Sequence, residues 1–212
     1  MLPIPTEKAS FTLSSGRESD YYIDLRLVTL RSEGAHCIAL MMMPLIGQLH
    51  VEAVGGLTLG ADPIIGALLQ LAGHYSYPLR GFIVRKQQKE HGTGKLIEGT
   101  VYPKDNVVLV EDVITTASSV LRAADALKKH AEGNKPVAVL SVVDRGEGGD
   151  MAIQEAGMQH FTIFTIDEIK AIAKEMLGIK GKDEDVPLCT EGCCDQGCVH
   201  EHFNPSLKFK RY

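Results

Sequence analysis

Five short runs of apolar, mostly β-branched residues recur along the chain and alternate with amphipathic stretches. The runs span residues 52–59, 81–85, 107–112, 137–144 and 160–164. Most of them are apolar throughout, which is typical of strands that are covered on both faces of a parallel sheet. The sequence therefore predicts an α/β fold with a central, mainly parallel sheet flanked by helices.

The stretches between these runs have the patterns of helices that would cover the sheet. Expected helices span 32–50, 62–77, 116–131, 150–156 and 167–177, with Ser32 as the N-cap of the first and Asp167 as a cap of the last. This order is that of a doubly wound sheet, in which ligands bind beyond the carboxyl ends of the strands. The residues that follow each strand are therefore the candidate functional residues.

Charge and hydropathy exclude two classes of function. The 212 residues carry a net charge of −5, which argues against holding nucleic acid by general phosphate neutralisation. The longest apolar run, 37–47, is shorter than the roughly 20 residues that a membrane-spanning helix needs, and residues 1–11 lack the pattern of a secretory signal. We expect a cytoplasmic protein that binds neither nucleic acid nor membrane.

The most informative strand exit is VVLVEDVITTASS, residues 107–119. Two carboxylates, Glu111 and Asp112, end the strand, and a hydroxyl-rich turn opens the next helix. The hydroxyl residues are Thr115, Thr116, Ser118 and Ser119. A helix N-terminus with hydroxyl donors attracts phosphate, while adjacent carboxylates suit sugar hydroxyls or a divalent cation. The pattern predicts a phosphorylated-sugar site with Mg²⁺ nearby; an ordinary capped helix is the alternative.

Three other strand exits carry possible ligand contacts. RKQQKEHGTG, residues 85–94, has cations between a strand and two glycines and suits closure over a polyanion, or is simply a solvated loop. Arg145, in the exit 142–149, could pair with a ligand carboxylate or form a surface salt bridge. The small residues of 55–63 allow backbone amides to approach an anion, unless Pro63 alone shapes this helix entry.

Together these segments resemble the type I phosphoribosyltransferases, which bind 5-phosphoribosyl-1-pyrophosphate (PRPP) through a motif like VVLVEDVITTASS. The loop pattern RKxxKxHGxG, the exit SVVDRGEGG and the N-terminal FTLSSGRESDYY, which reads as a turn between two short strands, resemble orotate phosphoribosyltransferases in particular. The resemblance covers roughly residues 6 to 170. It implies a pentosyl transfer from PRPP to orotate that gives orotidine 5-monophosphate and pyrophosphate, in pyrimidine biosynthesis.

The resemblance also implies site residues, Mg²⁺ and a homodimer with shared active sites. Catalytic roles fall to Lys89, His91 and Asp112, and orotate binding falls to Tyr22, Thr115 and Arg145. The implied PRPP-binding residues are Arg85, Lys86, Lys89, His91, Glu111, Asp112, Thr115, Thr116, Ala117, Ser118 and Ser119. Family members usually carry Gly at or near Ala117.

Two other functions are weighed against orotate transfer. A purine phosphoribosyltransferase would share the VEDVITT segment but would not need Arg145 or the FTLSSGR turn. A non-catalytic PRPP-binding regulator could dispense with the cationic loop, which this chain keeps.

The sequence predicts a phosphoribosyltransferase domain over 1–178, with a small N-terminal hood over 1–31, and a Cys/His-rich tail over 179–212. The tail holds possible ligands of a structural Zn²⁺, namely Cys189, Cys193, Cys194, Cys198, His200 and His202. A flexible thiol-rich tail, or disulfides formed on oxidation in vitro, are the alternatives. The remaining histidines, His160 among them, carry no motif and are expected to be structural or exposed.

Overall fold

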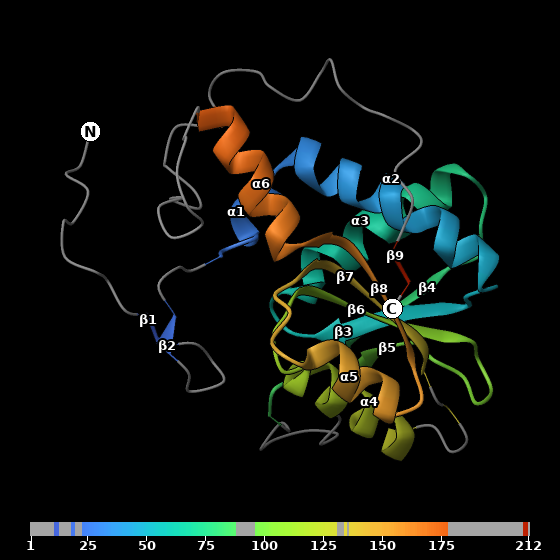
Figure 1. Ribbon diagram of the computed structural model, residues 1–212. Helices are drawn as coiled ribbons and strands as arrows, with labels where there is room; N and C mark the ends of the chain where they lie inside the picture. The colour runs from blue at the N-terminus through green and yellow to red at the C-terminus, as the bar shows by residue number, and fades with distance from the viewer. Residues whose placement is uncertain are drawn as a thin grey trace. The chain divides into compact units, whose positions relative to one another are not determined.

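The computed structural model describes residues 11–12, 18–19, 23–87, 96–130, 134, 136–177 and 210–211. Its centre is a seven-stranded sheet with the order β5-β4-β3-β6-β7-β8-β9 (Figure 1). Five neighbouring strands are parallel: β4 (Arg80–Val84), β3 (Ala53–Leu57), β6 (Val107–Ile114), β7 (Pro136–Asp144) and β8 (Gln159–Thr165). These are the five strands that the apolar runs predict, so the α/β expectation is confirmed.

The short strands differ from the prediction. The edge strands β5 (Ile97–Gly99) and β9 (Lys210–Arg211) pair antiparallel with β4 and β8, and the sequence does not predict them. Strands of two or three residues are too short to show a hydrophobic period. The predicted N-terminal strand pair is confirmed as β1 (Phe11–Thr12) antiparallel to β2 (Glu18–Ser19).

Helices lie on both faces of the sheet, as expected for a doubly wound fold. α2 (Ser32–Gln48) and α3 (Ala61–His74) lie on one face, and α4 (Ser118–His130) and α5 (Gly149–Glu155) lie on the other (Figure 1). The short α1 (Arg26–Thr29), which the sequence does not predict, precedes α2, and α6 (Ile166–Leu177) follows β8. No described helix is both long and apolar enough to cross a bilayer.

Four of the five predicted helix starts differ from the observed ones by one or two residues, and both predicted caps are wrong. Ser32 is the first residue of α2, because Arg31 takes the N-cap position without a capping side chain. Asp167 lies inside the first turn of α6, so it is not a cap. α4 begins at Ser118, since the left-handed backbone of Ala117, with φ +60°, cannot continue a right-handed helix.

The core on the α4 face joins strands and helices that are distant in sequence. Leu109, Val139, Leu127 and Ile153 are fully buried there. Each such side chain contributes roughly 1.5–3 kcal/mol through removal from water. This packing fixes α4 and α5 against the sheet and so determines where the strand exits lie.

The order of the strands creates one place where ligands are expected. The chain leaves β3 through α3 towards β4, and it leaves β6 through α4 towards β7, on opposite sides of the β3–β6 pair. Such a switch in direction opens a crevice beyond the carboxyl ends of the two strands. The segments 58–60 and 115–117 border it.

The chain divides into two compact units. One comprises Leu25–Thr165 with Phe209–Tyr212 and contains the central sheet, and the other comprises Met1–Asp24 with Ile166–Lys208. The strand exits considered below all belong to the first unit.

Candidate active site

The turn after β3 lies against the acidic end of β6. A Cβ atom at Gly60 would overlap the carboxylate of Asp112, so the two segments touch without room for a side chain. The backbone N–H of Thr58 donates to the Val84 carbonyl at 3.0 Å, which ties the same turn to the end of β4. Three strand exits therefore meet at the switch between β3 and β6.

Glu111 is a buried acid at this junction. It is 7% exposed, and its Oε2 accepts no hydrogen bond from the described residues. Burial, and next the neighbouring Asp112, raise the pKa of the Glu111 carboxyl well above its ordinary value, whereas Lys86 opposes the shift. Asp112 is partly exposed and accepts a hydrogen bond from the Val113 N–H at 2.9 Å. The adjacent acids thus differ in environment.

The hydroxyl-rich turn leads directly into the N-terminus of α4. Thr115 and Thr116 precede the helix, Ser118 begins it, and the Ala117 carbonyl accepts the first helical hydrogen bond from Leu121 at 2.9 Å. The first N–H groups of a helix have no partners within it and carry its positive dipole end. Ala117 takes the left-handed conformation that Gly adopts most readily, so the turn forms without glycine.

The exit of β7 packs against the same turn. The Arg145 N–H donates to the Ile114 carbonyl at 3.0 Å, and the Gly146 N–H donates to Asp144 Oδ1 at 2.9 Å. A Cβ atom at Gly149 would overlap Ile114 and crowd the Thr115 carbonyl. The loop that carries Arg145 therefore borders the hydroxyl turn.

Arg145 forms an ion pair within its own loop. Its Nε lies 2.8 Å from Glu147 Oε1, and the two side chains are 3% and 19% exposed. The salt bridge that is the alternative for Arg145 is thus present, with the Arg145 side chain buried and the Glu147 side chain partly exposed.

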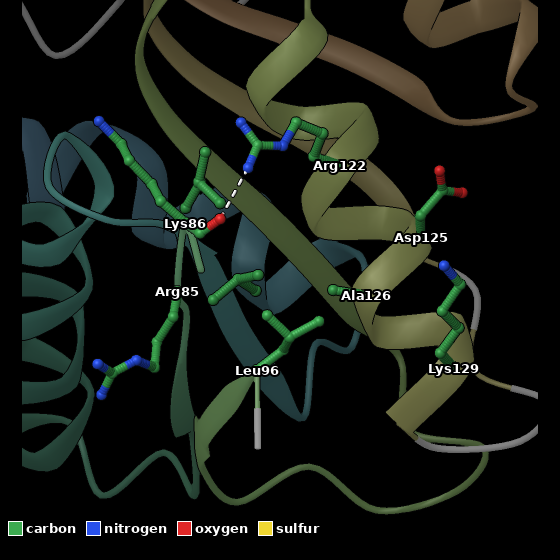
Figure 2. Close-up of a pocket in the computed structure, with 9 residues that line it drawn as sticks. Arg85, Lys86, Leu96, Arg122, Asp125, Ala126 and Lys129 are labelled. Carbon is green, nitrogen blue, oxygen red and sulfur yellow. Dashed lines mark hydrogen bonds between the residues drawn. The ribbon is translucent and has the colours of Figure 1, made fainter. Parts of the chain in front are cut away.

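The exit of β4 borders a pocket of about 220 Å³ next to α4 (Figure 2). Figure 2 shows the Arg122 guanidinium reaching from α4 to the Lys86 carbonyl, with a hydrogen bond of 2.9 Å. The Arg85 N–H donates to the Leu96 carbonyl at 2.9 Å, which continues the antiparallel pairing of β4 with β5. Arg85 Nη1 also lies 3.4 Å from Glu98 Oε1 on β5.

The structure brings together most of the predicted site residues that it describes. Lys86, Glu111, Asp112, Arg145 and the turn 115–119 lie around the switch, through the contacts given above. Other predicted residues lie outside the described part of the chain: Tyr22, Lys89, His91, Cys189, Cys193, Cys194, Cys198, His200 and His202. Within the described part, no group of three or more His, Cys, Asp or Glu side chains is arranged to hold a metal ion.

Two residues that shape the site are not among the predicted site residues. Arg122 holds the backbone of Lys86, and Gly60 permits the contact with Asp112. Arg122 follows no motif, so no signal in the sequence identifies it. Gly60 lies in the small-residue exit 55–63, where the sequence predicts only that backbone amides can approach an anion.

Comparisons with known proteins give one consistent result. The chain is 41% identical over 159 residues to an orotate phosphoribosyltransferase of Aquifex aeolicus, covering 75% of this chain and 86% of that protein. It is 40% identical over 166 residues to an orotate phosphoribosyltransferase of Rhodopirellula baltica, covering 76% of this chain and 85% of that one. No protein-family model matches the chain.

A solved structure agrees with these relatives. The orotate phosphoribosyltransferase of Mycobacterium tuberculosis H37Rv in complex with PRPP is 37% identical, with a TM-score of 0.62 over 74% of this chain and 88% of that one. The sheet, its switch point and the acidic strand exit define a phosphoribosyltransferase of type I. With relatives of about 40% identity along most of their length, the chain belongs to the orotate phosphoribosyltransferase family.

Proposed function

We propose that this protein transfers the 5-phosphoribosyl group from PRPP to orotate, which yields orotidine 5-monophosphate and pyrophosphate. The observation that carries the proposal is the meeting of an acidic pair, a hydroxyl-rich helix start and an arginine loop at one switch point. The acidic pair suits the ribose hydroxyls, the hydroxyl-rich helix start suits the 5-phosphate, and the arginine loop suits the carboxylate of orotate. The names of the relatives, and the PRPP bound to the mycobacterial one, support the same assignment.

The acidic pair and the hydroxyl turn would bind the ribose phosphate. Glu111 and Asp112 would accept hydrogen bonds from the ribose hydroxyls, because carboxylates are strong acceptors. The 5-phosphate would lie at the N-terminus of α4, within reach of Thr115, Thr116, Ser118, Ser119 and the Ala117 backbone. There the helix dipole and unpaired N–H groups favour an anion.

The reaction itself needs alignment and charge stabilisation. As pyrophosphate leaves, C1 of the ribose gains oxocarbenium character, so the ring nitrogen of orotate can attack without a protein nucleophile. Cations near the leaving group stabilise the charge that develops there. The Gly60 turn, Arg85 and Lys86 would face the pyrophosphate, and Lys89 and His91 with Asp112 are the proposed catalytic groups. Replacing Lys89 with Ala should lower turnover by ~10²-fold.

Orotate would bind through Tyr22, Thr115 and Arg145. The planar guanidinium of Arg145 matches the carboxylate of orotate, and its position beside the hydroxyl turn suits a base next to the ribose. The ion pair with Glu147 engages Nε, which orients the terminal nitrogens of the same group.

The donor set fits Mg²⁺. Glu111 and Asp112 offer the oxygen ligands that this ion prefers, and Glu111 Oε2 has no other partner in the described residues. Mg²⁺ usually binds through one or two carboxylates together with substrate phosphates, so Asp112 and the diphosphate of PRPP would hold it. The ion would neutralise charge on the leaving pyrophosphate.

The assembly and the tail remain proposals. We propose a homodimer in which the cationic loop completes the partner's site, and a phosphoribosyltransferase domain over 1–178 with a hood over 1–31.

The tail 179–212 is proposed to hold a structural Zn²⁺. Metal analysis of purified protein with intact thiols tests the proposed zinc site, and the absence of bound zinc would contradict it.

An assay with PRPP and Mg²⁺ tests the proposed function. Orotate, hypoxanthine and adenine are supplied in parallel, and the loss of orotate absorbance is followed. Turnover of orotate alone supports the proposal, while turnover of a purine base would favour a purine phosphoribosyltransferase. PRPP binding without turnover of any base would favour a regulator.

A further inference from the structure

Two buried side chains and one partly exposed side chain form a continuous hydrogen-bonded series beside the Arg145 loop. Ser141 Oγ on β7 lies 2.9 Å from His160 Nε2 on β8, and His160 Nδ1 lies 3.1 Å from Asp150 Oδ1 on α5. Ser141 is 0% exposed and His160 is 1% exposed. These hydrogen bonds therefore link the neighbouring strands β7 and β8 to the first turn of α5.

The chemistry of the three side chains determines which atom donates and which accepts in each hydrogen bond. An ionised Asp150 only accepts, so His160 Nδ1 donates to it, and in the neutral ring Nε2 then accepts from the Ser141 hydroxyl. These bonds fix the imidazole at both nitrogens. Because Ser141 is fully buried, it cannot reach a substrate as a nucleophile, although the order Ser, His, Asp resembles that of hydrolases.

The position of Asp150 connects these hydrogen bonds with the proposed orotate site. Asp150 directly follows Gly149, the first residue of α5, and the segment 145–148 joins β7 to this helix. At its start this segment is held by the bond from the Arg145 N–H to Ile114, and at its end Gly149 packs on Thr115. The contact from Asp150 to His160 is the side-chain bond that ties the end of the loop to β8.

We propose that His160 and Asp150 are positioning residues that hold the Arg145 loop in the geometry that binds orotate. The inference rests on the proposed function and deepens it. A displacement of about 1 Å at a substrate-orienting group is enough to impair binding or reaction. Loss of the contact should therefore weaken the use of orotate, while PRPP, held mainly by β6 and α4, is affected much less.

Two substitutions of His160 separate positioning from simple packing. His160→Asn keeps an N–H donor close to the Nδ1 position, whereas His160→Gln places its amide near the Nε2 position and loses the bond to Asp150. Both leave a polar, smaller side chain in the same buried site. Asp150→Ala removes the acceptor, and Gln154→Ala is the matched control, since Gln154 donates to the other oxygen of Asp150 at 2.8 Å on the exposed side.

Steady-state kinetics of the full chain with both substrates tests the proposal. His160→Gln and Asp150→Ala should raise the KM for orotate about tenfold, with the KM for PRPP changed less than about threefold. His160→Asn and Gln154→Ala should stay within about threefold of the wild type for both. The double variant with His160→Gln and Asp150→Ala should be no worse than either single one, because both remove the same contact.

Other outcomes overturn the proposal. Equal effects of His160→Asn and His160→Gln, additive effects in the double variant, or parallel increases of both KM values would indicate general loss of packing. If the wild type uses orotate but His160→Gln and Asp150→Ala keep its KM values, the positioning role is excluded while the proposed function stands. A wild-type protein that does not use orotate would refute the proposed function, and this inference with it.

Discussion

Gly60 lies directly against the carboxylate of Asp112, so that the turn after β3 and the end of β6 approach without an intervening side chain. The backbone of Gly60 is in the ordinary right-handed region, with φ −62° and ψ −39°. Glycine is therefore needed at this position for space and not for an unusual conformation.

Replacing Gly60 with Ala should displace the Asp112 carboxylate and lower kcat/KM for PRPP by about tenfold or more. The new methyl group suits the local backbone, so the melting temperature should change little. Gly66→Ala in α3, the helix that follows Gly60, is the control, because a Cβ there has nothing within 4 Å. It should keep full activity, and an equal loss of kcat/KM in both variants would contradict the spatial argument.

Ala117 should tolerate Gly but not Val. Its φ of +60° costs an Ala roughly 1–2 kcal/mol, and a β-branched side chain is still less favourable there. Ala117→Gly relieves this strain while losing a buried methyl group, so stability should stay within about 1 kcal/mol and PRPP binding should persist. Ala117→Val should weaken PRPP binding by about tenfold. Isothermal titration calorimetry measures PRPP binding, and thermal unfolding measures stability. Normal PRPP binding by the Ala117→Val variant would contradict the prediction.

Glu111→Gln should stabilise the protein increasingly as the pH rises. The folded state raises the pKa of Glu111 above its ordinary value of 4.5, mainly through burial, so the folded state holds this proton more tightly than the unfolded chain does. Rising pH therefore costs the wild type stability between the unfolded and the folded pKa, by up to about 1.4 kcal/mol per pH unit. Gln does not titrate and avoids that cost.

Denaturant unfolding of both proteins at pH 4 and pH 8 measures this effect. The stability difference between Glu111→Gln and wild type should be larger at pH 8. Glu155→Gln, at an exposed position of α5, is the control and should show no such trend. A difference that is independent of pH would show that Glu111 titrates alike in both states.

Glu147→Ala should raise the KM for orotate by about tenfold. Glu147 Oε1 lies 2.8 Å from Arg145 Nε in an ion pair, and removal of this negative charge lets the guanidinium turn away from its binding orientation. Glu147→Gln, which keeps an oxygen acceptor, should have a smaller effect. Kinetics at saturating PRPP provide the measurement, and a lower KM would instead show that Glu147 competes with orotate for Arg145.

Much of this fold follows from local sequence patterns. The five parallel strands are mostly apolar, with buried side chains along most of their length, and a strand covered on both faces requires that pattern wherever it lies in the chain. The strand exit with Glu111, Asp112 and the hydroxyl turn is contiguous, so the sequence alone assigns its chemistry. Helix starts were less accurate, because the φ of Ala117 and the N-cap of α2 depend on neighbouring elements.

The tertiary structure decided what the sequence leaves open. Contacts such as Gly60 with Asp112 and Ile114 with Arg145 join separate exits, and the register of the parallel strands determines them. His160 follows no motif, and only the side-by-side pairing of β7 with β8, together with the packing of α5, brings it between Ser141 and Asp150. Local patterns thus determined the elements and the chemical groups at their ends. Packing between elements distant in the chain determined which of those groups act together, because strand register and helix docking depend on the whole core.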